Sequence, residues 1–71
     1  MKITIEYCGM WNYLPRASSL ESQLKQRLPG AQIELIEGRG GIFEVSVAGK
    51  KIFSKKQTGR FPEVDEILRQ L

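Results

Sequence analysis

Alternating apolar and polar residues predict the strands of this chain. Residues 2–7 place Ile3, Ile5 and Tyr7 on one side and Lys2, Thr4 and Glu6 on the other, which is typical of a strand with one buried face. The same alternation recurs three times further along. Three more strands are therefore predicted, over residues 31–35, 42–47 and 51–54, the last two joined by a turn at Ala48-Gly49-Lys50.

A four-residue repeat of leucine predicts a helix between the first two strands. Leu20, Leu24 and Leu28 form its apolar stripe, and Pro29-Gly30 ends it. Two features disagree about where it starts. Ser18 followed by Glu21 is a capping-box pattern and favours a start at Ser18, whereas Pro15 fits a first turn and favours a start near Asn12 or Tyr13.

A second helix is predicted at the end of the chain. Pro62 suits its first position, acidic residues follow at once, and Arg69 complements its negative end. Residues 55–60 before it read as a polar loop. The predicted buried stripe is Val64, Ile67, Leu68 and Leu71.

The predicted order is therefore β-α-β-β-β-α in one domain covering residues 1–71. The first two strands, with a helix between them, should be parallel with a right-handed crossover. A four-stranded mixed sheet with both helices packed on it is the simplest way to bury the apolar faces, so the fold class is α+β.

The amino-acid composition excludes several kinds of metal site and catalytic site. The chain has one cysteine and no histidine, which excludes zinc sites built from cysteine and histidine and catalytic sites that use histidine as the base. A lone cysteine fits a reducing compartment, and neither a membrane span nor a signal peptide is recognisable. We expect a cytoplasmic protein with no metal.

Cys8 is the strongest candidate for chemistry. It follows the first predicted strand and precedes the first helix, where the positive end of a helix dipole stabilises a thiolate, the reactive form. Loop positions at the end of a strand usually face solvent, so we expect an exposed sulfur. Gly9 would let the backbone turn tightly after the strand.

The net charge of +3 is unevenly placed. Between Val45 and Pro62 there are five basic residues and no acidic one. The charges could guard a sheet edge as solvated lysines, form an anion-binding rim, or dock an acidic partner. Nucleic-acid binding would be weak and salt-sensitive with so few charges. The basic residues are Lys50, Lys51, Lys55, Lys56 and Arg60.

Two groups of residues carry a family resemblance. The first opens the chain, with Glu6-Tyr7-Cys8-Gly9, Tyr13, Pro15-Arg16, Leu20 and Leu28-Pro29. The second closes it, with Gly41-Ile42-Phe43-Glu44-Val45, Gly49, Ile52-Phe53-Ser54-Lys55-Lys56 and Gly59-Arg60-Phe61-Pro62. Over essentially its whole length the chain resembles selenoprotein W-like proteins of the SelT/SelW/SelH (Rdx) family. The resemblance implies a thioredoxin-like fold and an association with protein partners, including 14-3-3 adaptors.

The chain departs from the family pattern at one position. The resemblance implies a Cys-x-x-Cys or Cys-x-x-selenocysteine site, but here the motif reads Cys8-Gly9-Met10-Trp11. A dithiol site works because its second thiol resolves a mixed disulfide within the molecule. With Trp11 in that place no internal disulfide forms, and the dithiol cycle is not available.

Two functions follow as alternatives. In the first, Cys8 acts as a lone catalytic nucleophile that passes through a mixed disulfide or a sulfenic acid and is released by glutathione as a co-substrate, without any other cofactor. In the second, the fold is a non-catalytic module that binds a protein partner. The candidate binding residues are Gly9, Met10, Trp11, Lys55, Lys56 and Arg60.

A purely structural role is the competing interpretation of Cys8, as a small buried hydrophobe, and of the aromatic residues. Trp11 and Phe61 could close the end of the sheet, and Phe61 in particular stands just before a predicted helix, where an apolar residue commonly packs the helix onto the body. Trp11 is balanced between the two interpretations. Oligomeric state is not predicted.

Overall fold

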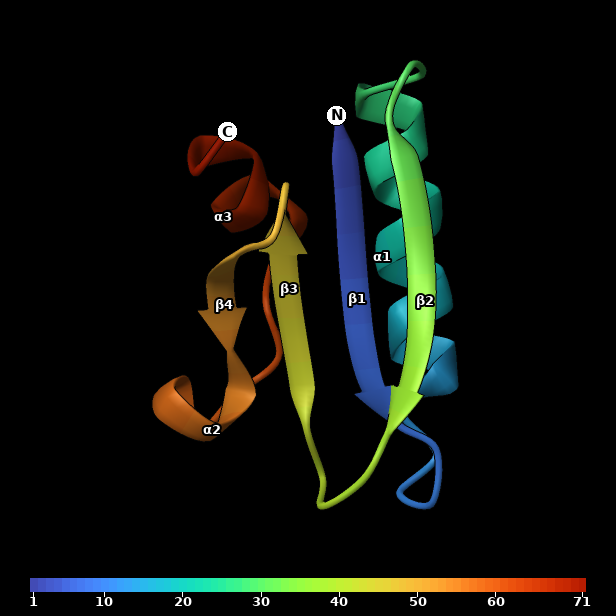
Figure 1. The fold of residues 1–71 in the computed structure, drawn as a ribbon, viewed down its shortest axis with the longest axis vertical. Coiled ribbons are helices and arrows are strands. Elements are labelled where there is room, and N and C mark those ends of the chain that lie inside the picture. Colours follow the sequence, from blue (N-terminus) through green and yellow to red (C-terminus); the bar gives the residue numbers. More distant parts are fainter.

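The computed structural model describes residues 1–71 and confirms the predicted order with one addition, a single-turn helix after the fourth strand. The structure is an α+β fold built on a four-stranded mixed sheet (Figure 1). Its elements are β1 (Lys2–Cys8), α1 (Leu14–Arg27), β2 (Gln32–Gly38), β3 (Phe43–Val47), β4 (Lys50–Ser54), α2 (Lys55–Thr58) and α3 (Val64–Arg69).

The strand order in the sheet is β2-β1-β3-β4. β1 and β2 are parallel, with Ile3 beside Ile33, as the β-α-β arrangement predicts. β1 and β3 are antiparallel, and so are β3 and β4. The turn between β3 and β4 places Ala48 at φ 51° and Gly49 at φ 83°, the positive angles that a tight hairpin turn requires.

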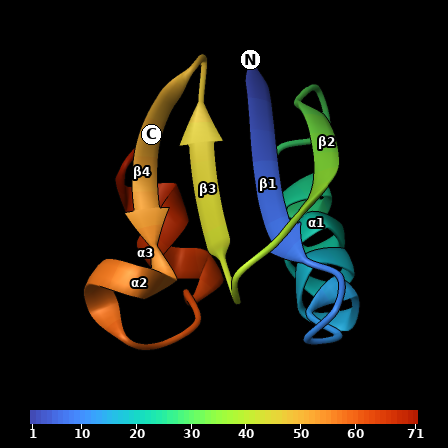
Figure 2. The same ribbon diagram turned by 60° about the horizontal axis from the view of Figure 1, so that its bottom comes forward.

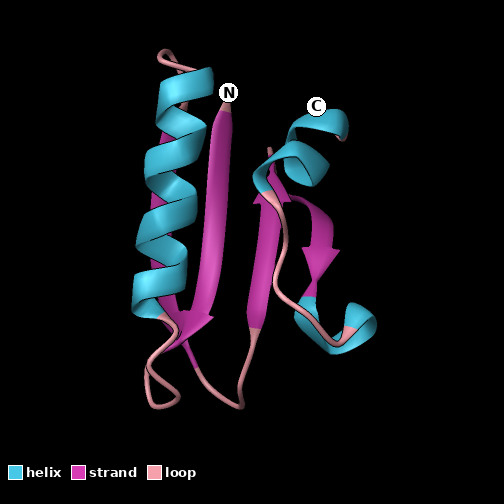
Figure 3. Cartoon of the chain, turned by 180° about the vertical axis from the view of Figure 1, so that it is seen from behind, coloured by secondary structure: helices cyan, strands magenta, loops and turns pink.

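Both longer helices lie on the same face of the sheet. The views in Figures 2 and 3 show α1 over β1 and β2, and α3 over β3 and β4. Because side chains alternate along a strand, this face receives Ile3 and Ile5 of β1 and Phe43 and Val45 of β3, all of them buried. The other buried members of the core are Ala17, Leu20, Leu24, Phe53 and Ile67. The second face of the sheet has no helix on it.

The segment predicted as a polar loop contains α2. The Ser54 side chain accepts a hydrogen bond from the backbone N–H of Gln57, and Gly59 at φ 76° ends the turn. A serine before the first turn and a glycine after the last are the usual start and stop of a helix. These signals were present in the sequence, but four residues show no apolar periodicity.

The last helix begins later than predicted. Pro62 lies before it, and Glu63 is its N-cap, joined to Glu66 by a capping box. Of the predicted stripe, Ile67 is buried and Val64 and Leu68 are half-buried, but Leu71 is exposed because the helix ends at Arg69. None of the three helices has the length and apolar character needed to cross a membrane.

Candidate functional site

A short turn connects β1 to α1 and begins at the cysteine. The N–H of Asn12 donates to the carbonyl of Gly9 at 3.0 Å, and the N–H of Tyr13 donates to the carbonyl of Cys8 at 3.1 Å. Asn12 has φ 60°, in the left-handed region that asparagine tolerates better than most residues. The turn therefore brings the start of α1 directly against the end of β1.

The helix start settles one of the open alternatives. α1 begins at Leu14 with Tyr13 as N-cap and Pro15 in the first turn. The earlier start is confirmed, and the start at Ser18 is wrong, since Ser18 lies inside the helix. Tyr13 makes no side-chain cap, so the proline and the turn, not a capping box, determine where this helix begins.

Cys8 does not face solvent, which corrects the expectation from its sequence position. It is fully buried and unpaired with another sulfur. Cys8 is the last residue of β1 and is held on both sides: Gly38 of β2 is its partner, and its N–H donates to the carbonyl of Ile42 at 3.0 Å. The expectation failed because the strand extends through the cysteine.

Ile42, from the loop between β2 and β3, is one of the neighbours of the buried cysteine. Alternation along β1 places Cys8 on the helix-free face, and it is not part of the core cluster. Gly38 and Ile42 flank it, and the Cδ1 atom of Ile42 occupies the space where a Cβ on Gly38 would lie. The Ile42 side chain therefore packs against Gly38, next to Cys8. None of the surface hollows includes Cys8.

The residues after Cys8 are exposed. Met10 is 90% exposed and Trp11 is 61% exposed. The Trp11 ring rests on the backbone of Gly41, where an added Cβ would come within 2.9 Å of it, and it meets Tyr13 edge-on at 6.1 Å between ring centroids. Trp11 is therefore a mostly exposed residue whose ring packs on the loop between β2 and β3.

Gly9 lies against the side chain of Glu37, but its backbone does not take the left-handed conformation that would require glycine. The carboxylate of Glu37 lies where a side chain on Gly9 would be. Any larger residue at Gly9 would displace Glu37 or the turn. The sequence predicted the glycine's role in the turn, but the contact with Glu37 depends on the pairing of β1 with β2.

The three predicted basic residues are in different places. Lys55 lies over the rings of Tyr13 and Phe61, at 5.5 and 5.4 Å from Nζ to the centroids. Lys56 is exposed. Arg60 donates from Nη1 and Nη2 to the two carboxylate oxygens of Glu66, at 2.8 and 2.6 Å. No hydrogen bond or ion pair joins any of them to Cys8.

Arg60 has a structural role. Its hydrogen bonds lower the pKa of the Glu66 carboxyl to about 2, and Glu66 in turn raises the pKa of Arg60. The guanidinium also lies 5.6 Å from the Phe53 ring. Arg60 thus fixes the loop after α2 to the start of α3, and its charge is already paired.

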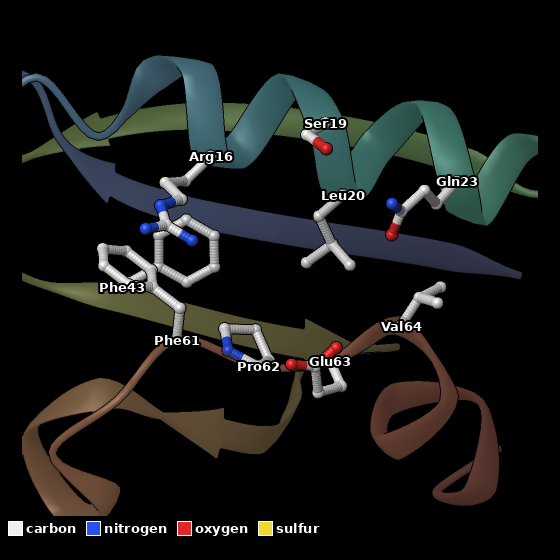
Figure 4. A pocket seen from close by; sticks show the side chains of 9 residues that line it. All are labelled: Arg16, Ser19, Leu20, Gln23, Phe43, Phe61, Pro62, Glu63 and Val64. Carbon is white, nitrogen blue, oxygen red and sulfur yellow. The ribbon is translucent and has the colours of Figure 1, made fainter.

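An aromatic cluster connects the turn to the rest of the fold. Tyr13, Phe61 and Phe43 meet edge-on, at 4.8 Å between the first two centroids and 5.2 Å between the last two. Arg16 lies 4.5 Å above Phe61. Figure 4 shows Arg16 beside the rings of Phe43 and Phe61, at one end of a groove between α1 and residues 61–64. Sequence analysis predicted the packing role of Phe61 but not its partners.

Sequence analysis missed a buried carboxylate on the helix-free face. Glu44 is buried, its Oε1 accepts from Lys51 at 2.8 Å, and its Oε2 has no hydrogen-bond partner. Burial alone would raise the pKa of Glu44, but the hydrogen bonds of Lys51 and Ser54 and the charge of Lys56 keep it below its ordinary value. No pattern in the sequence indicates this burial, because alternation predicts only that Glu44 avoids the core.

The structure brings some of the predicted site residues together and separates others. Met10, Trp11 and Tyr13 share the turn after Cys8, and Lys55 joins them through Tyr13. Arg60 is held at α3, and the charge of Lys56 acts on Glu44. The arrangement is an exposed apolar turn beside cationic side chains, with the thiol underneath it.

Comparison with known proteins agrees with this arrangement of elements. The chain is 34% identical to chicken selenoprotein W, covering all of this chain and 87% of that one. The whole of this chain is 31% identical to bovine migration and invasion enhancer 1, but it spans only 62% of the length of that protein. Both relatives are aligned over the whole of the described fold.

Solved structures show the same fold. A selenoprotein W-related protein from Vibrio cholerae superposes with a TM-score of 0.91 at 30% identity, covering 97% of this chain and 89% of that one. A protein from Bordetella parapertussis gives 0.87 at 25% identity, covering 99% and 96%. The fold is therefore thioredoxin-like. The Rdx family model matches residues 2–71, and the chain belongs to the Rdx family, whose members are generally linked to thiol redox chemistry.

Proposed function

We propose that this chain is a protein-binding member of the Rdx family that docks its partner through the turn after Cys8. The docking surface, here called the turn patch, consists of Met10, Trp11 and Leu14, all exposed apolar side chains. The observation that carries the proposal is a tryptophan 61% exposed at the position of the family's second redox residue. Exposed aromatic and methionine side chains of this kind are enriched at interface cores.

The burial of the thiol favours binding over catalysis. A thiol reacts as a thiolate that must be reached by its substrate, and Cys8 is buried beside Ile42 with no resolving cysteine nearby. The Trp11 ring rests on Gly41, the neighbour of Ile42. A partner bound to the turn patch would therefore restrict movement of Ile42 away from Cys8.

The charges beside the turn patch indicate an acidic partner. Lys55 lies over Tyr13, the ring next to Trp11, and Arg16 lies over Phe61, the ring beyond it. Arg39 borders a hollow with Met10 and Glu37. None of the three forms an ion pair within the chain. A partner that buries an apolar residue on the turn patch and places carboxylates near these cations would complement both the apolar surface and the positive charge. The partner segment should therefore combine an apolar anchor with acidic neighbours.

Peptide display tests this function directly. A random peptide library is selected on the wild-type chain and counter-selected on Trp11→Ala. We expect enriched peptides that combine a large apolar residue with Asp or Glu and that bind with micromolar affinity, as ordinary peptide docking does. Their affinity should fall about tenfold in Trp11→Ala and in Lys55→Ala, because an interface aromatic and a complementary charge are lost.

The control is Lys25→Ala, which removes an exposed lysine on the far part of α1 and should leave binding unchanged. Enrichment that does not depend on Trp11, or peptides without acidic residues, would contradict the proposal.

The second candidate is single-thiol redox chemistry at Cys8. The start of α1 lies against the backbone at the end of β1, because the N–H of Tyr13 donates to the Cys8 carbonyl, although the sulfur itself is on the opposite face of the sheet from α1. In this alternative a glutathione disulfide would be attacked only after Ile42 moves aside, giving a mixed disulfide on Cys8 and releasing one glutathione thiolate. The alkylation experiment described in the Discussion separates the two candidates.

A further inference from the structure

The outer edge of β2 is unprotected, unlike the edge on the other side of the sheet. β4 carries Lys50 and Lys51, pairs with β3 through an irregular register, and leads into α2. β2 pairs continuously with β1 from Gln32 to Gly38 and contains no lysine, proline or bulge. Natural proteins usually protect such edges because they are templates for another strand.

The free hydrogen-bonding groups on this edge can be identified. The N–H of Gln32 donates to the carbonyl of Met1, so even-numbered residues of β2 bond to β1. On the other side of β1, Cys8 bonds to Ile42 and Lys2 accepts from Ala48, which leaves the odd-numbered residues of β1 for β2. The outward N–H and C=O groups of β2 are therefore those of Ile33, Leu35 and Glu37.

We infer that a second copy of this chain pairs with the first, antiparallel, along β2, with Leu35 on the two-fold axis. In this register Leu35 bonds its own symmetry mate and Ile33 bonds Glu37 of the other copy, so all the outward groups are used. If the two-fold axis instead passed through Glu34, the Glu34 side chains of the two copies would face each other and their charges would repel. Centred on Leu35, Glu34 instead faces Ile36 of the other copy.

The side chains above the edge have unburied apolar surface that this pairing would cover. Ile33 and Leu35 point to the helix face but are only half-buried, whereas their neighbours Ile3 and Ile5 on β1 are fully buried. The difference arises because β2 has no strand beyond it. A second β2 would complete the layer, and the two sheets would become one.

The helix above the edge is compatible with the pairing. On one side of α1, Arg27 bonds Asp65 and Gln23 lines the groove toward residues 61–64. The opposite side of α1 points to the β2 edge and carries small or charged residues, namely Ser18, Glu21, Ser22 and Lys25. Across the axis the two helices would run antiparallel about 10 Å apart, the usual packing distance, with Glu21 and Lys25 able to exchange partners.

Sedimentation and amide exchange of the intact chain test the dimer. We expect the average mass to rise from monomer toward dimer between about 10 µM and 1 mM, the range of weak interfaces. The amides of Ile33, Leu35 and Glu37 should gain protection in parallel with the mass. A mass that stays monomeric, or protection confined to Met10 and Trp11, would overturn the inference.

A proline substitution gives a matched pair of variants. Glu37→Pro removes one outward N–H without removing a bond to β1, and proline is tolerated at such edge positions. We expect it to weaken the dimer at least about tenfold, since the bond is lost twice by symmetry. Glu37→Ala keeps the N–H and should dimerise like the wild type, and Trp11→Ala should also dimerise normally, which separates this inference from the proposed function.

Cysteine pairing tests the register. In a Cys8→Ser background, Glu34→Cys and Ile36→Cys proteins are mixed under mild oxidant. The proposed register places these positions opposite one another within disulfide reach, so the mixture should give a covalent heterodimer in at least about fivefold excess over either protein alone. Equal yields from each single variant would show a different register and overturn the two-fold at Leu35.

Discussion

Two residues, Gly38 and Ile42, lie beside the buried Cys8. Glycine at 38 leaves the space beside the sulfur empty, and the Ile42 side chain fills it. The surface is therefore apolar where the family's chemistry would require an open thiol. At the level of the single residue, we expect the position of Ile42 to control the access of a reagent to Cys8.

Alkylation measures this access. In the folded wild type we expect Cys8 to react with a neutral thiol reagent about 100-fold more slowly than in denaturant, because reaction needs local opening. Ile42→Ala should accelerate the native reaction about tenfold by removing most of this neighbouring side chain. Ile36→Ala, on the same face of the sheet but exposed, should leave it unchanged.

A wild-type rate near that of the denatured chain would restore the single-thiol candidate and weaken the binding proposal. The unfolding free energy of Ile42→Ala is measured alongside, so that faster global unfolding is not mistaken for local opening.

At the scale of elements, the short helix α3 depends on contacts at its start. Its capping box joins Glu63 to Glu66, and Arg60 binds both oxygens of the same Glu66 carboxylate. A helix of six residues is too short to be stable through its own hydrogen bonds. Packing of Ile67 in the core and this polar anchor together hold it in place.

Acid should weaken the anchor. The folded-state pKa of Glu66 is about 2, below its ordinary value of 4.5, so this carboxylate contributes stability that is complete above about pH 4.5 and is lost as the pH falls toward 2. Glu66→Gln should lower the urea midpoint at neutral pH, and its difference from the wild type should shrink over that acid range. Asp65→Asn, which changes an exposed carboxyl on the same helix, serves as the control, and a pH-independent difference would contradict the assignment.

For the whole molecule, Phe61 is the residue that connects the parts. It contacts Tyr13 before α1, Phe43 of β3, and the cations of Arg16 and Lys55. These contacts connect the turn patch, the sheet and the entrance to α3. In a domain of 71 residues with a small core, one such junction represents a large part of the net stability.

Truncation of Phe61 tests how much this side chain contributes to the free energy of unfolding. Phe61→Ala should lower the free energy of unfolding by roughly 3 kcal/mol, toward the lower end for a large aromatic because the ring is only half-buried. Phe61→Leu retains much of the volume and should cost about half as much. Urea unfolding of both variants gives the values, and a loss below about 0.5 kcal/mol for alanine would show that the ring is an ordinary surface side chain.

Local signals in the sequence were sufficient for most of the architecture. Alternation at Ile3 and Ile5, the leucine repeat around Leu20, and the turn at Gly49 each reflect backbone geometry within a few residues, and the structure confirms them. They failed where local signals were weak or competing. The single turn of α2 is too short to show apolar periodicity. Ser18 and Glu21 form a capping-box pattern inside α1, whose true start is marked by Pro15.

The environment of each candidate residue was decided only by tertiary structure. The sequence determined that Cys8 is alone and that Trp11 stands where a second redox residue would be. It did not determine that Cys8 and Glu44 are buried, or that Lys55 lies over Tyr13. The physical reason is that these contacts join residues far apart in the chain, through the pairing of β1 with β2 and β3, whereas local patterns specify only the face on which a side chain lies.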